Sequence, residues 1–162
     1  MSGKIKQISL SRLPEGTIIR KFMPYEQNSD YGEKRRTLLT KRELKGYTDN
    51  RIPLLYITTS KNNRNANTDI PVPDKVARIC GLKEGSIVCC TYVLAVKEDT
   101  IIPGRIVEGS MCKSGSFDFL LKVMSTFNNI EEKDMTFLGK DQPNPVEESI
   151  DDNTDVFVVM RF

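Results

Sequence analysis

The chain contains no histidine and no tryptophan, and its four cysteines form no Cys-x-x-Cys pair. Without histidine, the commonest general acid/base is missing, and neither a Ser-His nor a Cys-His nucleophile pair can form. A zinc site would need all four thiols, and two of them, Cys89 and Cys90, are adjacent in sequence, which is poor ligand geometry. We therefore expect no metal site, no cofactor and no enzymatic activity. Reduced, mostly buried thiols are the expected role of Cys80, Cys89, Cys90 and Cys112.

Long apolar segments are also missing. No run approaches the roughly 18 residues that a membrane-spanning helix needs, and residues 1–6 have no apolar stretch typical of a secretory signal. The P-loop, G-x-G-x-x-G, G-x-S-x-G and EF-hand patterns are absent as well. With 162 residues, the chain fits one domain. The expected setting is a reducing compartment such as the cytosol.

Charge is divided unevenly along the chain. Residues 1–70 hold 14 Lys and Arg against 7 Asp and Glu, whereas residues 71–162 hold 10 against 15. The densest basic group is Lys34, Arg35, Arg36, Lys41, Arg42 and Lys45. The densest acidic group is Glu147, Glu148, Asp151, Asp152 and Asp155. A basic patch attracts phosphate on nucleic acid or on an anionic membrane; an ordinary solvated face is the alternative. The basic half of one molecule can also meet the acidic half of the next, and such head-to-tail contacts build rings or filaments.

Hydrophobic patterning predicts an α+β fold: a single compact domain with a mainly antiparallel sheet packed against one or two helices. The predicted strands are residues 4–10, at an edge, then 17–22, 52–59, 86–96, a return strand from 101, a small strand near 135–138, and 156–162. Residues 37–44 are compatible with strand or helix. Polar composition predicts exposed loops at residues 23–36, 60–69 and 139–155.

Two helices are predicted in the second half of the chain. Asp74 suits the N-terminus of a short helix through Cys80, and Gly81 suits the position that follows it. The second helix begins after Ser116, a good N-cap residue, and ends at Asn128-Asn129. Its expected buried stripe, with i, i+3, i+4, i+7 spacing, is Phe117, Leu120, Leu121, Met124 and Phe127. A Phe/Met stripe of this kind can bind a partner but more often belongs to the core.

The middle segment resembles the swapped-hairpin (AbrB-like) DNA-binding motif. The matching residues are Pro73, Val76, Gly81, Leu82, Gly85 and Val88, followed by a hairpin. The arginine that usually follows the aliphatic residue is Ala77 here. This resemblance covers about 30 of the 162 residues, and it implies a nucleic-acid-binding regulator.

The same region is similar to the matrix proteins of rhabdoviruses over roughly 60 collinear residues. The sequence Val72-Pro73-Asp74-Lys75 precedes a short helix, and Glu84-Gly85-Ser86-Ile87-Val88 enters a long strand that ends in Lys97-Glu98-Asp99. Ser116-Phe117-Asp118-Phe119 then opens a helix, and Ile130-Glu131-Glu132 follows at similar spacing. The short chain resembles the matrix proteins of plant-infecting members. The lysine-rich tail and late-domain motifs of animal rhabdoviruses are missing.

The matrix resemblance implies a non-enzymatic structural protein of the virion and the host cytoplasm, at the inner face of the membrane, which is not secreted. Its implied partners are further copies of itself, the viral nucleocapsid, an anionic membrane surface and nucleic acid. We assign membrane or phosphate binding to Lys34, Arg35, Arg36, Lys41, Arg42 and Lys45. We assign self-association to Lys61, Arg64, Glu147, Glu148, Asp151 and Asp152. The swapped-hairpin regulator is the alternative function.

Overall fold

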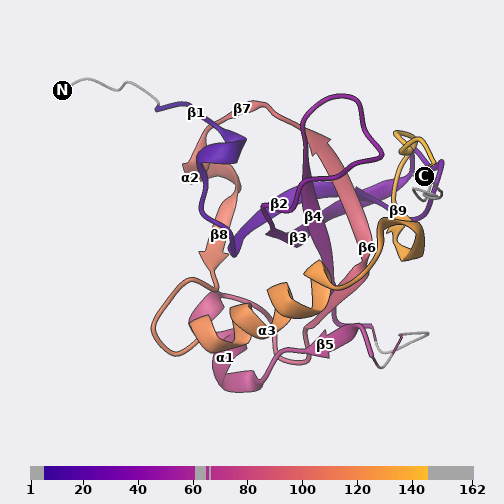
Figure 1. The fold of residues 1–162 in the computed structure, drawn as a ribbon. Helices are drawn as coiled ribbons and strands as arrows, with labels where there is room; N and C mark the ends of the chain where they lie inside the picture. The colour runs from indigo at the N-terminus through magenta and orange to yellow at the C-terminus, as the bar shows by residue number, and fades with distance from the viewer. Residues whose placement is uncertain (1–5, 61–64, 66, 146–162) are drawn as a thin grey trace, which may run out of the picture.

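An antiparallel sheet organises the chain in a computed structural model that describes residues 6–60, 65 and 67–145. Its strand order is β5-β6-β4-β3-β2-β8, and β9 pairs with β6 off this path (Figure 1). These strands are β2 (Thr17–Pro24), β3 (Gly32–Leu39), β4 (Arg51–Thr58), β5 (Asp69–Pro71), β6 (Ile87–Lys97), β8 (Val107–Ser110) and β9 (Thr136–Phe137). A separate two-stranded sheet joins β1 (Ile8–Ser9) and β7 (Thr100–Ile101). The helices are η1 (Leu10–Arg12), α1 (Asp74–Cys80), α2 (Pro103–Ile106), α3 (Phe117–Asn128) and η2 (Glu132–Asp134).

The long strand β6 is the centre of this arrangement. One of its edges pairs with β4 from Thr58↔Ile87 to Arg51↔Lys97, with a register shift after Leu55. The other edge pairs with β5 and then, in parallel, with β9. Strand β6 therefore has neighbours from its own chain on both edges, and the strand predicted at 86–96 is confirmed. The fold class expected from the sequence is confirmed as well.

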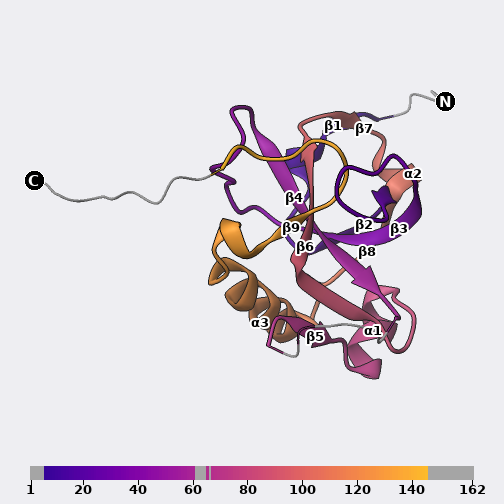
Figure 2. The same ribbon diagram turned by 90° about the vertical axis from the view of Figure 1, so that its right-hand side faces the viewer.

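Apolar side chains are buried on both faces of the sheet. Adjacent residues of a strand point to opposite faces, and β2, β3 and β4 each contribute a consecutive buried pair. The members that pack toward α1 and α3 are Ile18, Leu38 and Leu55. The members that pack toward η1, which lies on the opposite face, are Ile19, Leu39 and Leu54. Figures 1 and 2 show α1 and α3 together at one end of the molecule, away from β1 and β7.

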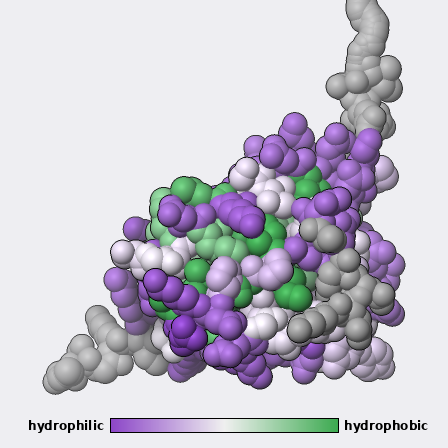
Figure 3. Space-filling model, turned by 90° about the horizontal axis from the view of Figure 1, so that it is seen from below, coloured by the Kyte–Doolittle hydropathy of each residue, from purple (hydrophilic) through white to green (hydrophobic). Residues whose placement is uncertain are grey.

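Helix α3 confirms the helix predicted after Ser116, but the residues predicted to be buried on it are partly wrong. The buried residues are Phe119, Leu120, Val123, Met124 and Phe127. Phe117 and Leu121, which were expected in the core, are 46% and 51% exposed. At 100° per residue, Phe117 and Leu121 lie away from the centre of the buried stripe. Apolar residues occupy so much of the helix that their spacing alone does not determine which face turns toward the core. Figure 3, which views the α1–α3 end, shows apolar surface bordered by hydrophilic side chains.

Two further expectations about the chain are wrong. Residues 23–36, predicted as an exposed loop, are the end of β2, a short turn and the start of β3. Their polar composition arises because this hairpin extends beyond the core and is exposed along much of its length. The return strand from Ile101 does not pair with β6: as β7 it pairs with β1 instead. The N-terminal edge strand is confirmed only as the short β1.

Other expectations are confirmed in part. Helix α1 ends as predicted, with Gly81 in the left-handed region (φ 81°). Ser116 precedes α3, but its side chain makes no capping bond; its Oγ donates to the carbonyl of Met111 at 2.7 Å instead. Residues 37–39 belong to β3. Residues 139–145 are free of helix and strand apart from one bridge at Gly139, whereas the rest of the 139–155 loop and the 156–162 strand lie outside the described residues.

The corrected orientation of α3 predicts different costs for two phenylalanines on this helix. Phe127 is fully buried, so Phe127→Ala should lower the free energy of unfolding by about 3–5 kcal/mol. Phe117→Ala removes the same side chain from an exposed position and should cost less than about 1 kcal/mol. Urea denaturation of both variants measures the difference. Equal losses would contradict the orientation of α3.

Candidate functional site: a basic groove beside the β2–β3 hairpin

Strands β3 and β4 run side by side for three residues and then separate. The only register pairs between them are Leu39↔Leu54, Leu38↔Leu55 and Thr37↔Tyr56. Beyond that point β4 continues along β6, whereas β3 continues along β2 to Gly32. The register shift between β4 and β6 falls at the same place, and irregularities of this kind bend and twist a strand. A groove of about 390 Å³ lies where the two strands part.

Five cationic side chains line this groove. Strand β3 supplies three of them, β2 supplies one, and the turn between α1 and β6 supplies the last. These residues are Arg20, Lys34, Arg35, Arg36 and Lys83. Residues paired across an antiparallel ladder share a face, so Arg20 and Arg36 lie directly opposite one another. Cations that the sequence places far apart are therefore gathered by strand pairing and by the α1–β6 turn.

Two carboxylates balance part of this charge. Glu108 of β8 lies 3.2 Å from Arg20 Nε and 3.1 Å from Arg36 Nε. The hydrogen bond from Arg20 is the main cause that lowers the pKa of Glu108, which therefore stays ionised. Glu33 pairs with Arg35 at 2.5 Å. Five cations against two anions leave the groove with a net positive charge, and Lys34 and Lys83 are its most exposed members.

The side of the groove opposite β3 carries hydroxyl groups beside Lys83. Its residues are Thr58, Thr59 and Ser86, together with the apolar Ile57 and Leu82. Ser86 Oγ donates to the carbonyl of Lys83 at 2.6 Å, which fixes the turn that carries this lysine. Thr58 Oγ1 accepts from the backbone N–H of Ser60 at 3.0 Å. Because the proton of Ser86 is already donated to Lys83, the hydroxyl groups of Thr58 and Thr59 are the ones that can donate to a phosphate oxygen.

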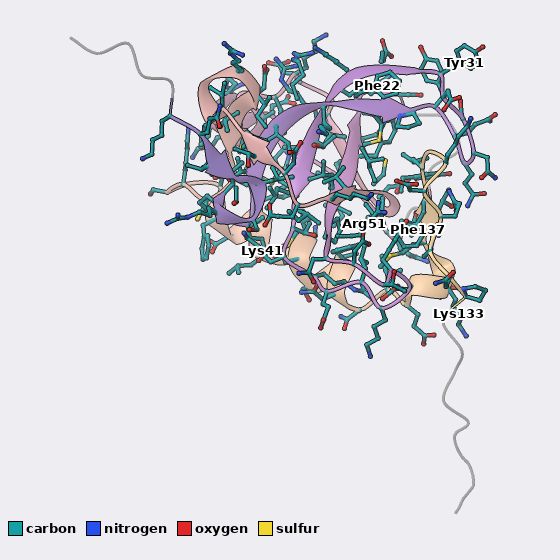
Figure 4. The ribbon with its side chains drawn as sticks, turned by 90° about the horizontal axis from the view of Figure 1, so that it is seen from above. Phe22, Tyr31, Lys41, Arg51, Lys133 and Phe137 are labelled. Carbon is teal, nitrogen blue, oxygen red and sulfur yellow. The ribbon has the colours of Figure 1, made fainter. Side chains whose placement is uncertain are left out.

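Exposed aromatic side chains gather on the same hairpin. Phe22, Tyr25 and Tyr31 are 44%, 62% and 79% exposed, and all three lie on β2 or on the turn that leads to β3. Phe22 is paired directly with Lys34 across the ladder. Figure 4 shows Phe22 and Tyr31 along the same arm of the molecule. The hairpin thus combines basic and exposed aromatic residues.

The second half of the predicted basic patch lies elsewhere. Lys41, Arg42 and Lys45 follow β3 in the connection to β4, and Figure 4 shows Lys41 well away from Phe22 and Tyr31. Lys41 Nζ donates to the carbonyl of Ser11. The structure therefore divides the six residues predicted as one phosphate-binding patch: the first three line the groove, and the last three do not.

Arg42 has a structural role. Its Nη1 donates to the carbonyl of Phe127 at 2.7 Å, and its guanidinium lies 5.1 Å from the centroid of the Phe127 ring. A cation there also opposes the negative end of the α3 dipole. Burial lowers the pKa of Arg42, and the charge of Glu132 partly offsets this effect. Arg42 is committed to the end of α3 and is not available to a ligand.

Sequence reasoning missed Arg20, Lys83 and the three hydroxyl residues of the groove. Arg20 would have been found if residues 23–36 had been predicted as a hairpin, because the ladder then places Arg20 opposite Arg36. No sequence signal places Lys83 beside β3, because that contact depends on the path of β4 and β6. The six residues predicted for self-association, Lys61, Arg64, Glu147, Glu148, Asp151 and Asp152, lie outside the described residues.

The four cysteines lie apart from the groove and form no disulfide. Cys80, Cys89 and Cys90 are buried free thiols, and Cys112 is an exposed one. Burial raises the pKa of Cys90 to about 12, so this thiol stays protonated at neutral pH. Within residues 6–60, 65 and 67–145, no cluster of three metal-ligating side chains occurs. None of the helices in these ranges is long and apolar enough to cross a bilayer.

Comparisons with known proteins add no relative to this description. Neither the protein-family models nor the curated protein sequences contain a match to the chain. The groove and the hairpin are therefore the features from which a function can be inferred.

Because Arg42 holds the end of α3, its replacement should lower the stability of the protein without weakening its binding to anionic vesicles. Arg42→Ala removes a charged hydrogen bond to the end of α3 and should lower the free energy of unfolding by about 1–2 kcal/mol. Lys45→Ala is the control: its exposed side chain makes no hydrogen bond or ion pair with the residues that the structure describes, so stability should hardly change. Urea denaturation of the two variants tests this assignment. A stable Arg42→Ala protein that no longer binds anionic vesicles would show that Arg42 contacts the ligand instead.

Proposed function

We propose that the protein is a non-enzymatic, matrix-like structural protein that binds phosphate-bearing surfaces through the basic groove and self-associates. The surfaces are the nucleocapsid and the anionic inner face of a membrane. The observation that carries the proposal is the gathering of Arg20, Lys34, Arg35, Arg36 and Lys83 around one groove, with hydroxyl groups opposite. The similarity of residues 72–132 to rhabdovirus matrix proteins supports the same function.

Electrostatics favour a phosphate surface over a small neutral ligand. The groove is open and polar, and its cations exceed its carboxylates. A basic residue close to an anionic membrane contributes about 1 kcal/mol to binding, and salt screens this contribution. Phosphates on nucleic acid attract the same side chains by releasing counterions. Binding to either surface should therefore weaken as ionic strength rises.

The aromatic residues of the hairpin suit the membrane side of this function. Tyrosine and other aromatic side chains prefer the boundary between water and lipid, where one part of the ring system is apolar and another is wet. Phe22 is paired with Lys34, and the exposed Tyr31 lies on the same hairpin, directly before β3. A hairpin of this composition can place its rings among headgroups while its lysines contact lipid phosphates.

The swapped-hairpin regulator is the less favoured function. A swapped hairpin needs strands of a partner chain to complete its small barrel. In the described part of the chain, β4, β5 and β9 already occupy both edges of β6, which is the strand that follows the motif. Helix α3 closes the core from within the same chain. These features favour a monomeric core that associates through its surface.

If the groove is the binding site, the loss of vesicle binding should depend on where a lysine is replaced and not on the net charge of the variant. Lys34→Glu/Lys83→Glu removes two groove lysines and should weaken binding to phosphatidylserine vesicles by about thirty-fold or more, since two lysines contribute roughly 2 kcal/mol. Lys41→Glu/Lys45→Glu makes the same change in net charge outside the groove and should bind nearly as the unmodified protein does. Co-sedimentation with anionic and neutral vesicles, and with nucleocapsids, measures both variants. If the two double variants lose binding equally, the groove is not the site.

A further inference from the structure

We infer that the basic groove also receives the acidic C-terminal segment, residues 147–155, of a second copy of the chain, so that self-association and phosphate binding compete for one site. This inference rests on the proposed function, because it names the contact through which the protein self-associates. It depends on three features: an open strand edge, complementary charge, and the place where the described chain ends.

Among the described residues, no strand pairs with the edge of β3 that faces the groove. Between residues 33 and 36, β3 pairs with β2 on one side, whereas its pairing with β4 begins at Thr37. Alternate backbone N–H and C=O groups of such a strand point away from its only neighbour and invite pairing with another extended chain. Main-chain pairing of this kind supplies affinity, and side-chain contacts beside it supply specificity.

The charges of the two partners are complementary. The groove is lined by five cations and one carboxylate, Glu33, and Glu108 pairs with two of the arginines from beside it. The C-terminal segment carries five carboxylates, at Glu147, Glu148, Asp151, Asp152 and Asp155, and residues 147–155 contain no Lys or Arg. Bidentate contacts between arginine and carboxylate are among the stronger charged hydrogen bonds. Arg20 and Arg36 already share Glu108, so a segment carboxylate competes with Glu108 for their guanidinium groups. The exposed Lys34 and Lys83 are the first cations that the segment meets.

The last described residues are held at the other end of β4. The N–H of Asn144 donates to the carbonyl of Gly46 at 2.7 Å, and Asp141 pairs with Arg51 at 3.2 Å. Arg51 also lies 4.7 Å from the centroid of the Tyr47 ring, whose hydroxyl donates to the carbonyl of Asp141 at 2.6 Å. Burial raises the pKa of Tyr47 to about 12, so the hydroxyl remains a donor. These contacts fix the start of the C-terminal segment near Arg51.

This placement favours a second copy over the same chain. Strand β4 runs from Arg51 to Thr58, about 23 Å at 3.3 Å per residue, before it reaches the groove. Glu147 is three residues beyond Asn144 and extends no more than about 11 Å from it. Glu147 and Glu148 therefore cannot reach the groove of their own chain, although Asp151, Asp152 and Asp155 lie far enough along the chain to do so. Only the segment of a second copy can place all five carboxylates at the groove. Each chain then offers one groove and one segment, and head-to-tail contacts of this type build rings or open-ended filaments.

Mixing two full-length variants tests this contact. Glu147→Gln/Glu148→Gln/Asp151→Asn/Asp152→Asn removes four of the five negative charges of the segment and leaves only Asp155. Lys34→Glu/Lys83→Glu reverses the charge of the two exposed cations of the groove. At low salt, sedimentation velocity should give each variant alone a self-association constant at least tenfold lower than that of the unmodified protein. A mixture of the two should form a one-to-one dimer and nothing larger, because only one intact groove and one intact segment remain. Unchanged self-association of either variant would overturn the inference.

A matched control and a binding assay separate this inference from the proposed function. Glu43→Gln/Asp118→Asn/Glu131→Gln/Asp134→Asn changes the charge by the same amount at exposed positions elsewhere and should associate as the unmodified protein does. The segment variant should bind phosphatidylserine vesicles at least as tightly as the unmodified protein, because its groove has lost a competitor. If vesicles and nucleocapsids are not bound but the mixed dimer forms, the proposed function is wrong and the self-association contact stands. If vesicle binding is normal but association follows net charge and not position, the inference is wrong and the proposed function stands.

Discussion

Strand β4 follows β6 along its whole length and follows β3 for three residues only. The other features of the binding face depend on this unequal pairing. It frees the distal half of the β2–β3 hairpin from the rest of the sheet, opens the groove, and leaves one edge of β3 without a strand. It also brings the α1–β6 turn, with Lys83, to the far wall of the groove. If β3 and β4 had paired to their ends, the same basic side chains would lie on an unbroken sheet surface.

The sequence predicted the elements with the strongest periodic or capping signals. The strand at 86–96 and the helix from Phe117 were predicted because their apolar runs are long, and Gly81 marked the end of α1. The predicted buried stripe of α3 differs from the observed one because Phe, Leu, Val and Met occupy much of the circumference of that helix. Only tertiary packing selects which of these residues face the core. The 23–36 segment was mistaken for a loop because a hairpin that extends past the core has no apolar face to reveal its strand period.

The candidate site was predictable only in part, because it depends on contacts between residues that are far apart in the sequence. Lys34, Arg35 and Arg36 were found as a charge run, and the structure places all three at the groove. Lys41, Arg42 and Lys45 belong to the same run in sequence, but the chain turns away after β3, and Arg42 is bound to the end of α3. The density of basic residues along the sequence therefore located the candidate binding region, whereas strand pairing determines which of these basic residues line the same groove. Long-range contacts of this type carry no local signal.

The central claim is that the opening between β3 and β4 is where phosphate binds. The most direct measurement is a two-dimensional ¹⁵N–¹H NMR titration of the full-length protein with inorganic phosphate and then with a short single-stranded RNA, at low salt. The account predicts that the backbone amides of residues 33–36, 58–59 and 83–86 shift first and saturate together, while those of residues 41–45 stay in place. Shifts centred on residues 41–45, or spread evenly over all lysines and arginines, would contradict it.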